Sequence, residues 1–72
     1  MNINETLDNL IGNIVENDNG VISLDTQNKY EEMLGRKVRF MMTGYAYTQE
    51  YSPGRVNLYL DKDLKIKRYT FG

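Results

Sequence analysis

Few side chains in this chain are suited to acid, base or nucleophilic chemistry. Its 72 residues include neither Cys nor His, which excludes thiolate nucleophiles, imidazole acids and bases, and the usual zinc sites. An adjacent pair of carboxylates, Glu31 and Glu32, falls on an expected helix, where neighbouring residues point in different directions and do not converge on a substrate. We therefore expect no enzymatic activity, no catalytic residue, no cofactor and no metal site.

A polar segment in the second half has residue types suited to binding. Residues 44–61 form a polar loop that contains Pro53 and leads into an alternating strand. Three tyrosines fall within seven residues of this loop: Tyr45, Tyr47 and Tyr51. Tyrosine offers a large contact area at low entropic cost, and proline fixes its own φ and restricts the residue before it. The segment is expected to be a displayed recognition loop.

The net charge of −1 conceals an asymmetry between the two halves. Residues 1–35 carry seven acidic side chains against Lys29, whereas residues 36–72 carry eight basic side chains against three acidic ones. Attraction between the halves within one fold is the first interpretation, and a basic patch for an anionic partner is the alternative. Tyrosines interleaved with Arg and Lys leave single-stranded nucleic-acid binding as a minor alternative, although no Gly-rich phosphate cradle accompanies them.

The length and the first residues limit the organisation of the protein. A chain of this length predicts a single domain, residues 1–72, with a small core. The N-terminus has neither a basic region nor an apolar run, and no stretch approaches the roughly 20 apolar residues of a membrane span. We expect a cytoplasmic protein with no membrane partner and leave its oligomeric state open.

Two helices are expected in the first half. Asn4 can cap a short helix that ends at Ile11. Asp25 can cap a helix over residues 26–34, which Gly35 would terminate. The apolar face of this second helix would comprise Tyr30, Met33 and Leu34.

A tight turn and three strands are expected elsewhere. Asn19-Gly20 predicts the turn, because both residues tolerate positive φ. Apolar residues alternate over 37–43 and 56–61, and a third strand over 65–71 needs a bulge near Lys67 to keep its pattern in phase. About ten residues separate the first two strands. Because parallel pairing normally needs a crossover of a dozen or more residues, this length alone favours a hairpin.

The loop and the strand after it also match a known pattern. The matching residues are Gly44, Thr48, Glu50, Tyr51, Arg55-Val56 and Leu58 to Asp61. In this arrangement residues 44–62 resemble, without a gap, the reactive loop and following strand of the potato type I serine protease inhibitors, the family of the barley chymotrypsin inhibitor and eglin. A related family of small bacterial inhibitors shares the loop pattern and often ends in Gly, as this chain does at Gly72.

The resemblance implies an α+β fold in which one main helix packs on a small mixed sheet of three to four strands. An exposed loop would join two parallel strands, which overrides the preference for a hairpin. It also implies that the loop enters a serine protease as a substrate would, with Gln49–Glu50 as the bond presented. The target-binding residues would be Tyr45, Tyr47, Thr48, Gln49, Glu50, Tyr51, Ser52 and Pro53.

Basic side chains on the following strand brace such loops, and the resemblance assigns this role to Arg55, which would reach Thr48 and Glu50. Asn57 stands where plant members commonly have a second bracing arginine, and it can supply only a weaker bond. Gln49 replaces the apolar residue that would fill an apolar specificity pocket, which disfavours a chymotrypsin- or subtilisin-like target and leaves proteases with a polar pocket for Gln open. The alternative function is a non-protease interaction protein on the same scaffold, such as a phage-encoded antagonist of a host or defence protein.

Overall fold

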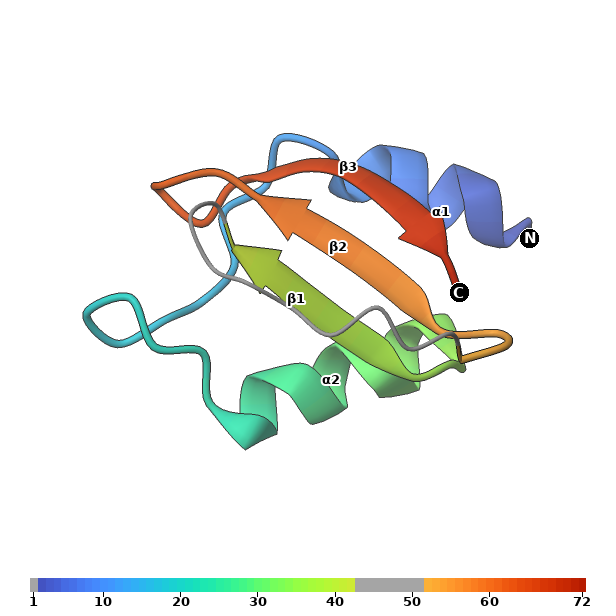
Figure 1. Ribbon diagram of the computed structural model, residues 1–72, viewed down its shortest axis with the longest axis horizontal. Coiled ribbons are helices and arrows are strands. Elements are labelled where there is room, and N and C mark those ends of the chain that lie inside the picture. The colour runs from blue at the N-terminus through green and yellow to red at the C-terminus, as the bar shows by residue number, and fades with distance from the viewer. Residues whose placement is uncertain (1, 43–51) are drawn as a thin grey trace.

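The computed structural model describes residues 2–42 and 52–72 and has the expected α+β architecture (Figure 1). The two helices are α1 (Ile3–Leu10) and α2 (Leu24–Leu34). The three strands are β1 (Val38–Met42), β2 (Val56–Leu60) and β3 (Ile66–Phe71), in the sheet order β1-β2-β3. In Figure 1, α2 runs alongside β1 and α1 lies beyond β3.

The parallel pairing of β1 with β2 confirms the expectation from the resemblance. The register runs from Val38 opposite Val56 to Met42 opposite Leu60. The hairpin that loop length alone favoured is wrong. β2 and β3 pair antiparallel, and their register shifts between Tyr59 and Leu60. This shift leaves one extra residue, Lys67, in β3, where the sequence predicted a bulge.

Both helices begin two residues earlier than their predicted caps imply. The Asn2 side chain accepts a hydrogen bond from the Asn4 amide at 2.8 Å, and Ser23 Oγ accepts one from the Thr26 amide at 3.2 Å. Asn4 and Asp25 were therefore wrong as caps. Closely spaced residues here are all good cap formers, so residue type alone does not select among them. The second helix ends as predicted at Gly35, whose φ is 67°.

The tight turn between the helices is confirmed. Asn19 and Gly20 have φ values of 53° and 88°, and Asp18 and Val21 exchange two backbone hydrogen bonds of 2.9 and 3.0 Å. The preceding segment does not continue this hairpin. Ile14 instead bridges Lys65 next to β3.

The core lies where the helices cover one face of the sheet. Its buried residues are Leu7, Val15, Leu34, Val38, Val56, Leu58, Leu60, Leu64 and Ile66. Met33, which the sequence placed on the apolar face of α2, is 51% exposed, and Thr26 is buried instead. Among residues 2–42 and 52–72 no helix has the length and apolar character to cross a membrane.

The other face of the sheet carries the alternate side chains of each strand. Because side chains alternate along a strand, Asn57 and Tyr59 of β2 point away from the core side that holds Val56, Leu58 and Leu60. The register places residues of β1 and β3 beside them. We call this surface the polar face; it comprises Arg39, Met41, Asn57, Tyr59, Arg68 and Thr70.

Candidate functional site

The predicted target-binding segment is described only at its C-terminal end. Ser52 and Pro53 lie within the described residues. Tyr45, Tyr47, Thr48, Gln49, Glu50 and Tyr51 lie outside them. The predicted contacts of Arg55 with Thr48 and Glu50 therefore also fall outside the described residues.

A turn connects this segment to β2. The Arg55 amide donates a hydrogen bond to the Ser52 carbonyl at 3.1 Å. Pro53 occupies the second position of the turn, and Gly54 occupies the third with a φ of 82°, which is the pattern of a type II turn. Proline fixes the φ angle that the second position of this turn needs. Glycine is the residue that adopts the positive φ of the third position without strain. The chain thus enters β2 along a fixed path.

The two predicted bracing residues meet at Gly72. Arg55 Nη2 donates to the Gly72 carbonyl oxygen at 3.1 Å, and Asn57 Nδ2 donates to the same oxygen at 2.9 Å. The Gly72 amide in turn donates to the Arg55 carbonyl at 2.8 Å. We call these three bonds the Gly72 anchor. It fixes the start of β2, where the predicted loop ends, to the end of β3.

A second set of contacts continues across the polar face. Asn57 Nδ2 also donates to Thr70 Oγ1 at 3.3 Å, and Thr70 Oγ1 donates to Tyr59 Oη at 3.4 Å. The Arg68 guanidinium lies 3.8 Å from the centroid of the Tyr59 ring, a cation–π arrangement. Thr70, Tyr59 and Arg68 were not among the site residues predicted from the sequence. The antiparallel register places Asn57 opposite Thr70 and Tyr59 opposite Arg68. Pairing the two predicted strands in this register would have identified these residues.

Asn57 is the most buried polar residue of this set. It is 6% exposed, and its Oδ1 atom has no hydrogen-bond partner within the described residues. A buried acceptor without a donor costs roughly 1 to 3 kcal/mol. Asn57 therefore bonds to Gly72 and Thr70 through its amide nitrogen while its oxygen remains unsatisfied there.

Two tyrosines with raised pKa values, Tyr69 and Tyr30, lie away from this site. Tyr69 of β3 donates a hydrogen bond to Asp8 of α1 at 2.9 Å, and this bond raises the pKa of Tyr69. Burial raises the pKa of Tyr30, with a smaller contribution from Glu16. Across residues 2–42 and 52–72, no three His, Cys, Asp or Glu side chains gather as metal ligands would.

The chain matches no protein-family model and no curated protein. The geometry of the described residues and the resemblance of residues 44–62 are therefore the grounds for a function.

Proposed function

We propose that the protein is a small cytoplasmic inhibitor or antagonist that binds a target protein through residues 45–54, with a serine protease as the target. In this proposal Gln49–Glu50 is the substrate-like bond. Residues Tyr45 to Pro53 contact the target, and Arg55 and Asn57 support the loop from β2. The protein itself is not an enzyme and uses no cofactor.

The parallel pairing of β1 and β2 is the observation that carries the proposal. Residue 42 at the end of β1 and residue 56 at the start of β2 lie at opposite ends of the pair. Five paired residues are four steps apart from end to end, about 13 Å at the usual rise per residue, so the chain between Met42 and Val56 must cover at least that length. A connection of this kind between paired parallel strands is what the resemblance implies for a reactive loop.

The Gly72 anchor supports the same proposal at the C-terminal end of the loop, where the chain enters β2. Restricting the loop end before binding lowers the entropy that ordering costs on association. Both ends of the connection are also attached to paired strands. If a protease cut Gln49–Glu50, the new amine and the acyl group would stay close together, which favours religation over release.

Inhibition assays with the intact chain against serine proteases of chymotrypsin, subtilisin, trypsin and glutamine-accepting specificity test the proposal. We expect inhibition of an enzyme with a polar pocket, together with slow cleavage at Gln49–Glu50 seen by mass spectrometry. Gln49→Leu is the matched variant, and it should shift inhibition toward enzymes with apolar pockets. Absence of both inhibition and cleavage at this bond, for both chains, would contradict the proposal.

Asn57 favours the second candidate, a non-protease interaction protein on the same scaffold such as a phage-encoded antagonist. The asparagine supports Gly72 and Thr70 through one amide nitrogen, a weaker arrangement than a second arginine would give. A loop held less rigidly suits a partner that never attacks the peptide bond. Stable binding of a non-protease partner that is lost in a Gln49→Ala, Tyr51→Ala variant, without protease inhibition, would select this candidate.

The geometry of Tyr59 gives no support to single-stranded nucleic-acid binding. The Arg68 guanidinium already covers one face of the ring, and base stacking needs an accessible aromatic face.

A further inference from the structure

The tight turn between the helices contains a chemically reactive pair, Asn19 and Gly20. Asparagine is a labile residue, because the backbone nitrogen of the next residue can attack its side-chain amide carbon. Glycine in that next position leaves the nitrogen unhindered, since it has no Cβ. Asn19 is the one asparagine in the sequence that glycine follows. The residue pair most open to deamidation therefore lies in this turn.

Deamidation of this pair would take two steps. The Gly20 nitrogen loses its proton and bonds to Cγ of Asn19, while the bond from Cγ to Nδ2 breaks and ammonia leaves with that proton. A five-membered succinimide ring remains. Water then opens the ring at either of its two carbonyl carbons, which gives aspartate or isoaspartate. Water is the only co-reactant.

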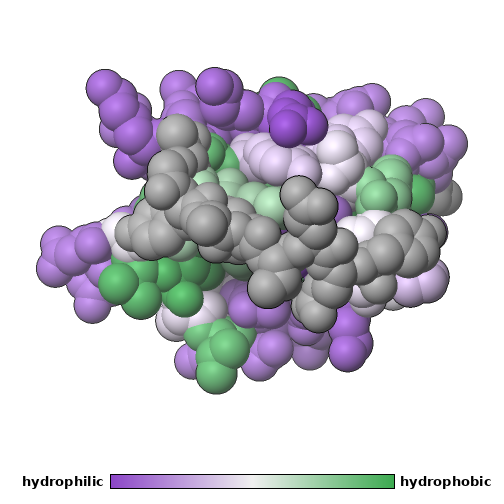
Figure 2. All heavy atoms as spheres, viewed as in Figure 1, coloured by the Kyte–Doolittle hydropathy of each residue, from purple (hydrophilic) through white to green (hydrophobic). Residues whose placement is uncertain are grey.

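Solvent reaches the turn freely. Residues 16–21 are all exposed. Figure 2 shows hydrophilic residues at the left of the molecule, where this turn projects in Figure 1. The fold therefore blocks neither the entry of water nor the departure of ammonia, and any control over the reaction must come from the turn itself.

The closed turn keeps the two reacting atoms apart. The φ values of Asn19 and Gly20 are 53° and 88°, and Asp18 and Val21 exchange two backbone hydrogen bonds. This is the pattern of a type I′ turn. In such a turn ψ of the first central residue is about +30°, which places the Gly20 nitrogen nearly opposite Cβ of Asn19 across the Cα–C bond. Ring closure needs these two atoms on the same side, so the turn must open first.

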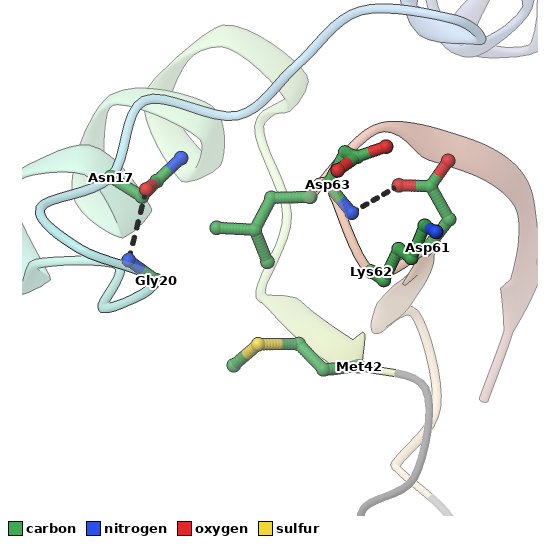
Figure 3. Close-up of a pocket in the computed structure, with 7 residues that line it drawn as sticks. Asn17, Gly20, Met42, Asp61, Lys62 and Asp63 are labelled. Carbon is green, nitrogen blue, oxygen red and sulfur yellow. Dashed lines mark hydrogen bonds between the residues drawn. The ribbon is translucent and has the colours of Figure 1, made fainter.

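The Asn17 side chain holds the turn closed at the reactive nitrogen. Asn17 Oδ1 accepts a hydrogen bond from the Gly20 amide at 3.0 Å, as Figure 3 shows. Asn17 Nδ2 donates to the Val15 carbonyl at 2.8 Å, and Val15 is fully buried. The nitrogen that would attack Asn19 is thus connected to the core through one side chain.

We propose that Asn19 is a deamidation site and that Asn17 sets its rate by holding the Gly20 amide. Exposed turns open locally without unfolding of the whole chain. The reaction takes place in the open turn, so its rate follows the fraction of molecules in which the turn is open. Loss of the Asn17 bond raises that fraction.

The two products change the turn in different ways. Isoaspartate lengthens the backbone by one carbon, which disturbs the two bonds between Asp18 and Val21. Aspartate keeps the backbone but adds a negative charge to residues 16–25, which carry Glu16, Asp18 and Asp25 and no basic side chain. Like charges repel at this spacing. Because ammonia is lost, either change is permanent.

Deamidation of the full chain in native buffer and in concentrated urea tests this proposal. Digestion and mass spectrometry locate a mass gain of about one dalton, and synthetic peptides separate aspartate from isoaspartate. We expect Asn19 to react at least tenfold more slowly in native buffer than in urea. Asn17→Ala should raise the native rate at least threefold and leave the rate in urea unchanged.

Three more variants sharpen the comparison. Asn17→Asp keeps an acceptor for the Gly20 amide but loses the amide donor, so its native rate should lie between those of the original chain and Asn17→Ala. Asn13→Ala changes another exposed asparagine and should leave the rate at Asn19 as it is. Asn19→Gly tolerates the positive φ but has no side-chain amide, and it should abolish the mass gain at this turn.

Three results would overturn the proposal. Equal native rates in the original chain and a folded Asn17→Ala chain would remove the role of Asn17. Equal rates in native buffer and urea would show that the turn exerts no control, and faster modification of other asparagines in urea would show that Asn19 is not the site. If Asn17→Ala fails to fold, Asn17→Asp decides, because a native rate equal to that of the original chain would count against the proposal.

Discussion

The start of β2 and the outer edge of β1 use their polar groups in opposite ways. At the start of β2, the Gly72 carbonyl accepts from both Arg55 and Asn57, and the Gly72 amide donates to Arg55. At the edge of β1, the outward groups of Phe40 bond to nothing within the described residues. The Gly72 backbone groups are thus bonded inside the fold, whereas the outward groups of Phe40 have no bond within the described residues.

This difference separates two ways of binding. A segment whose ends are fixed beforehand presents one conformation and costs little entropy to bind. An open strand edge instead orders the incoming segment, whose backbone supplies the missing bonds. We therefore expect changes at the Gly72 anchor to alter the behaviour of residues 45–54, and changes at the edge of β1 to alter the protection of its backbone amides.

Arg55→Ala should have the largest effect. A hydrogen bond from a charged donor contributes roughly 1.5 to 3 kcal/mol, so its loss should speed cleavage at Gln49–Glu50 about tenfold or more. Arg55→Lys keeps the charge but not the forked donor geometry and should give an intermediate rate. Timed mass spectrometry with a protease measures both. Equal cleavage rates in all three chains would show that the anchor does not support the loop.

Asn57→Ala should destabilise the fold by about 1 to 2 kcal/mol, because it removes the bonds to Gly72 and Thr70. Tyr59→Phe is the control, since it removes only the longer bond from Thr70. Urea unfolding measures the free energy for each chain. If Asn57→Ala is no less stable than Tyr59→Phe, the anchor does not depend on the asparagine.

Glu31→Ala should cost about 1 kcal/mol, because it removes Glu31 Oε2, which accepts a hydrogen bond from the Val38 amide at 3.0 Å. Glu32→Ala changes the neighbouring exposed carboxylate and should stay within about 0.5 kcal/mol. Amide hydrogen exchange should also accelerate at Val38 in the first variant only. Unchanged exchange at Val38 would mean that the Glu31 side chain of α2 does not protect the Val38 amide at the edge of β1.

The smallest effect should come from acidification at the Asp61 turn. Hydrogen bonds from the Lys65 and Asp63 amides lower the pKa of Asp61 below its ordinary value of 3.8. A lowered pKa in the fold gives stability that is present above the ordinary value and is lost as pH falls through the folded value. Melting temperatures recorded through the acidic range should fall less in Asp61→Asn than in the original chain. Parallel acid profiles would contradict this assignment.

Local patterns predicted most of the fold, and long-range contacts account for what they missed. A few neighbouring residues were enough to predict the alternation in the strands, the bulge at Lys67 and the end of α2 at Gly35. The direction of β2 relative to β1 came from the resemblance, because the length of the connection favoured a hairpin. Neither the bonds from Arg55 and Asn57 to Gly72 nor the cover of β3 by residues 12–15 leaves a local signal, since each joins distant segments.

The equilibrium between intact and cut chains tests the central proposal most directly. A protease that the chain inhibits would be incubated with intact protein and, separately, with protein already cut at Gln49–Glu50. We predict that both samples reach the same ratio of intact to cut chain, because the strands hold the two new ends together for religation. Complete cleavage of the intact sample, with no resynthesis of intact chain in the sample that was already cut, would contradict the proposal.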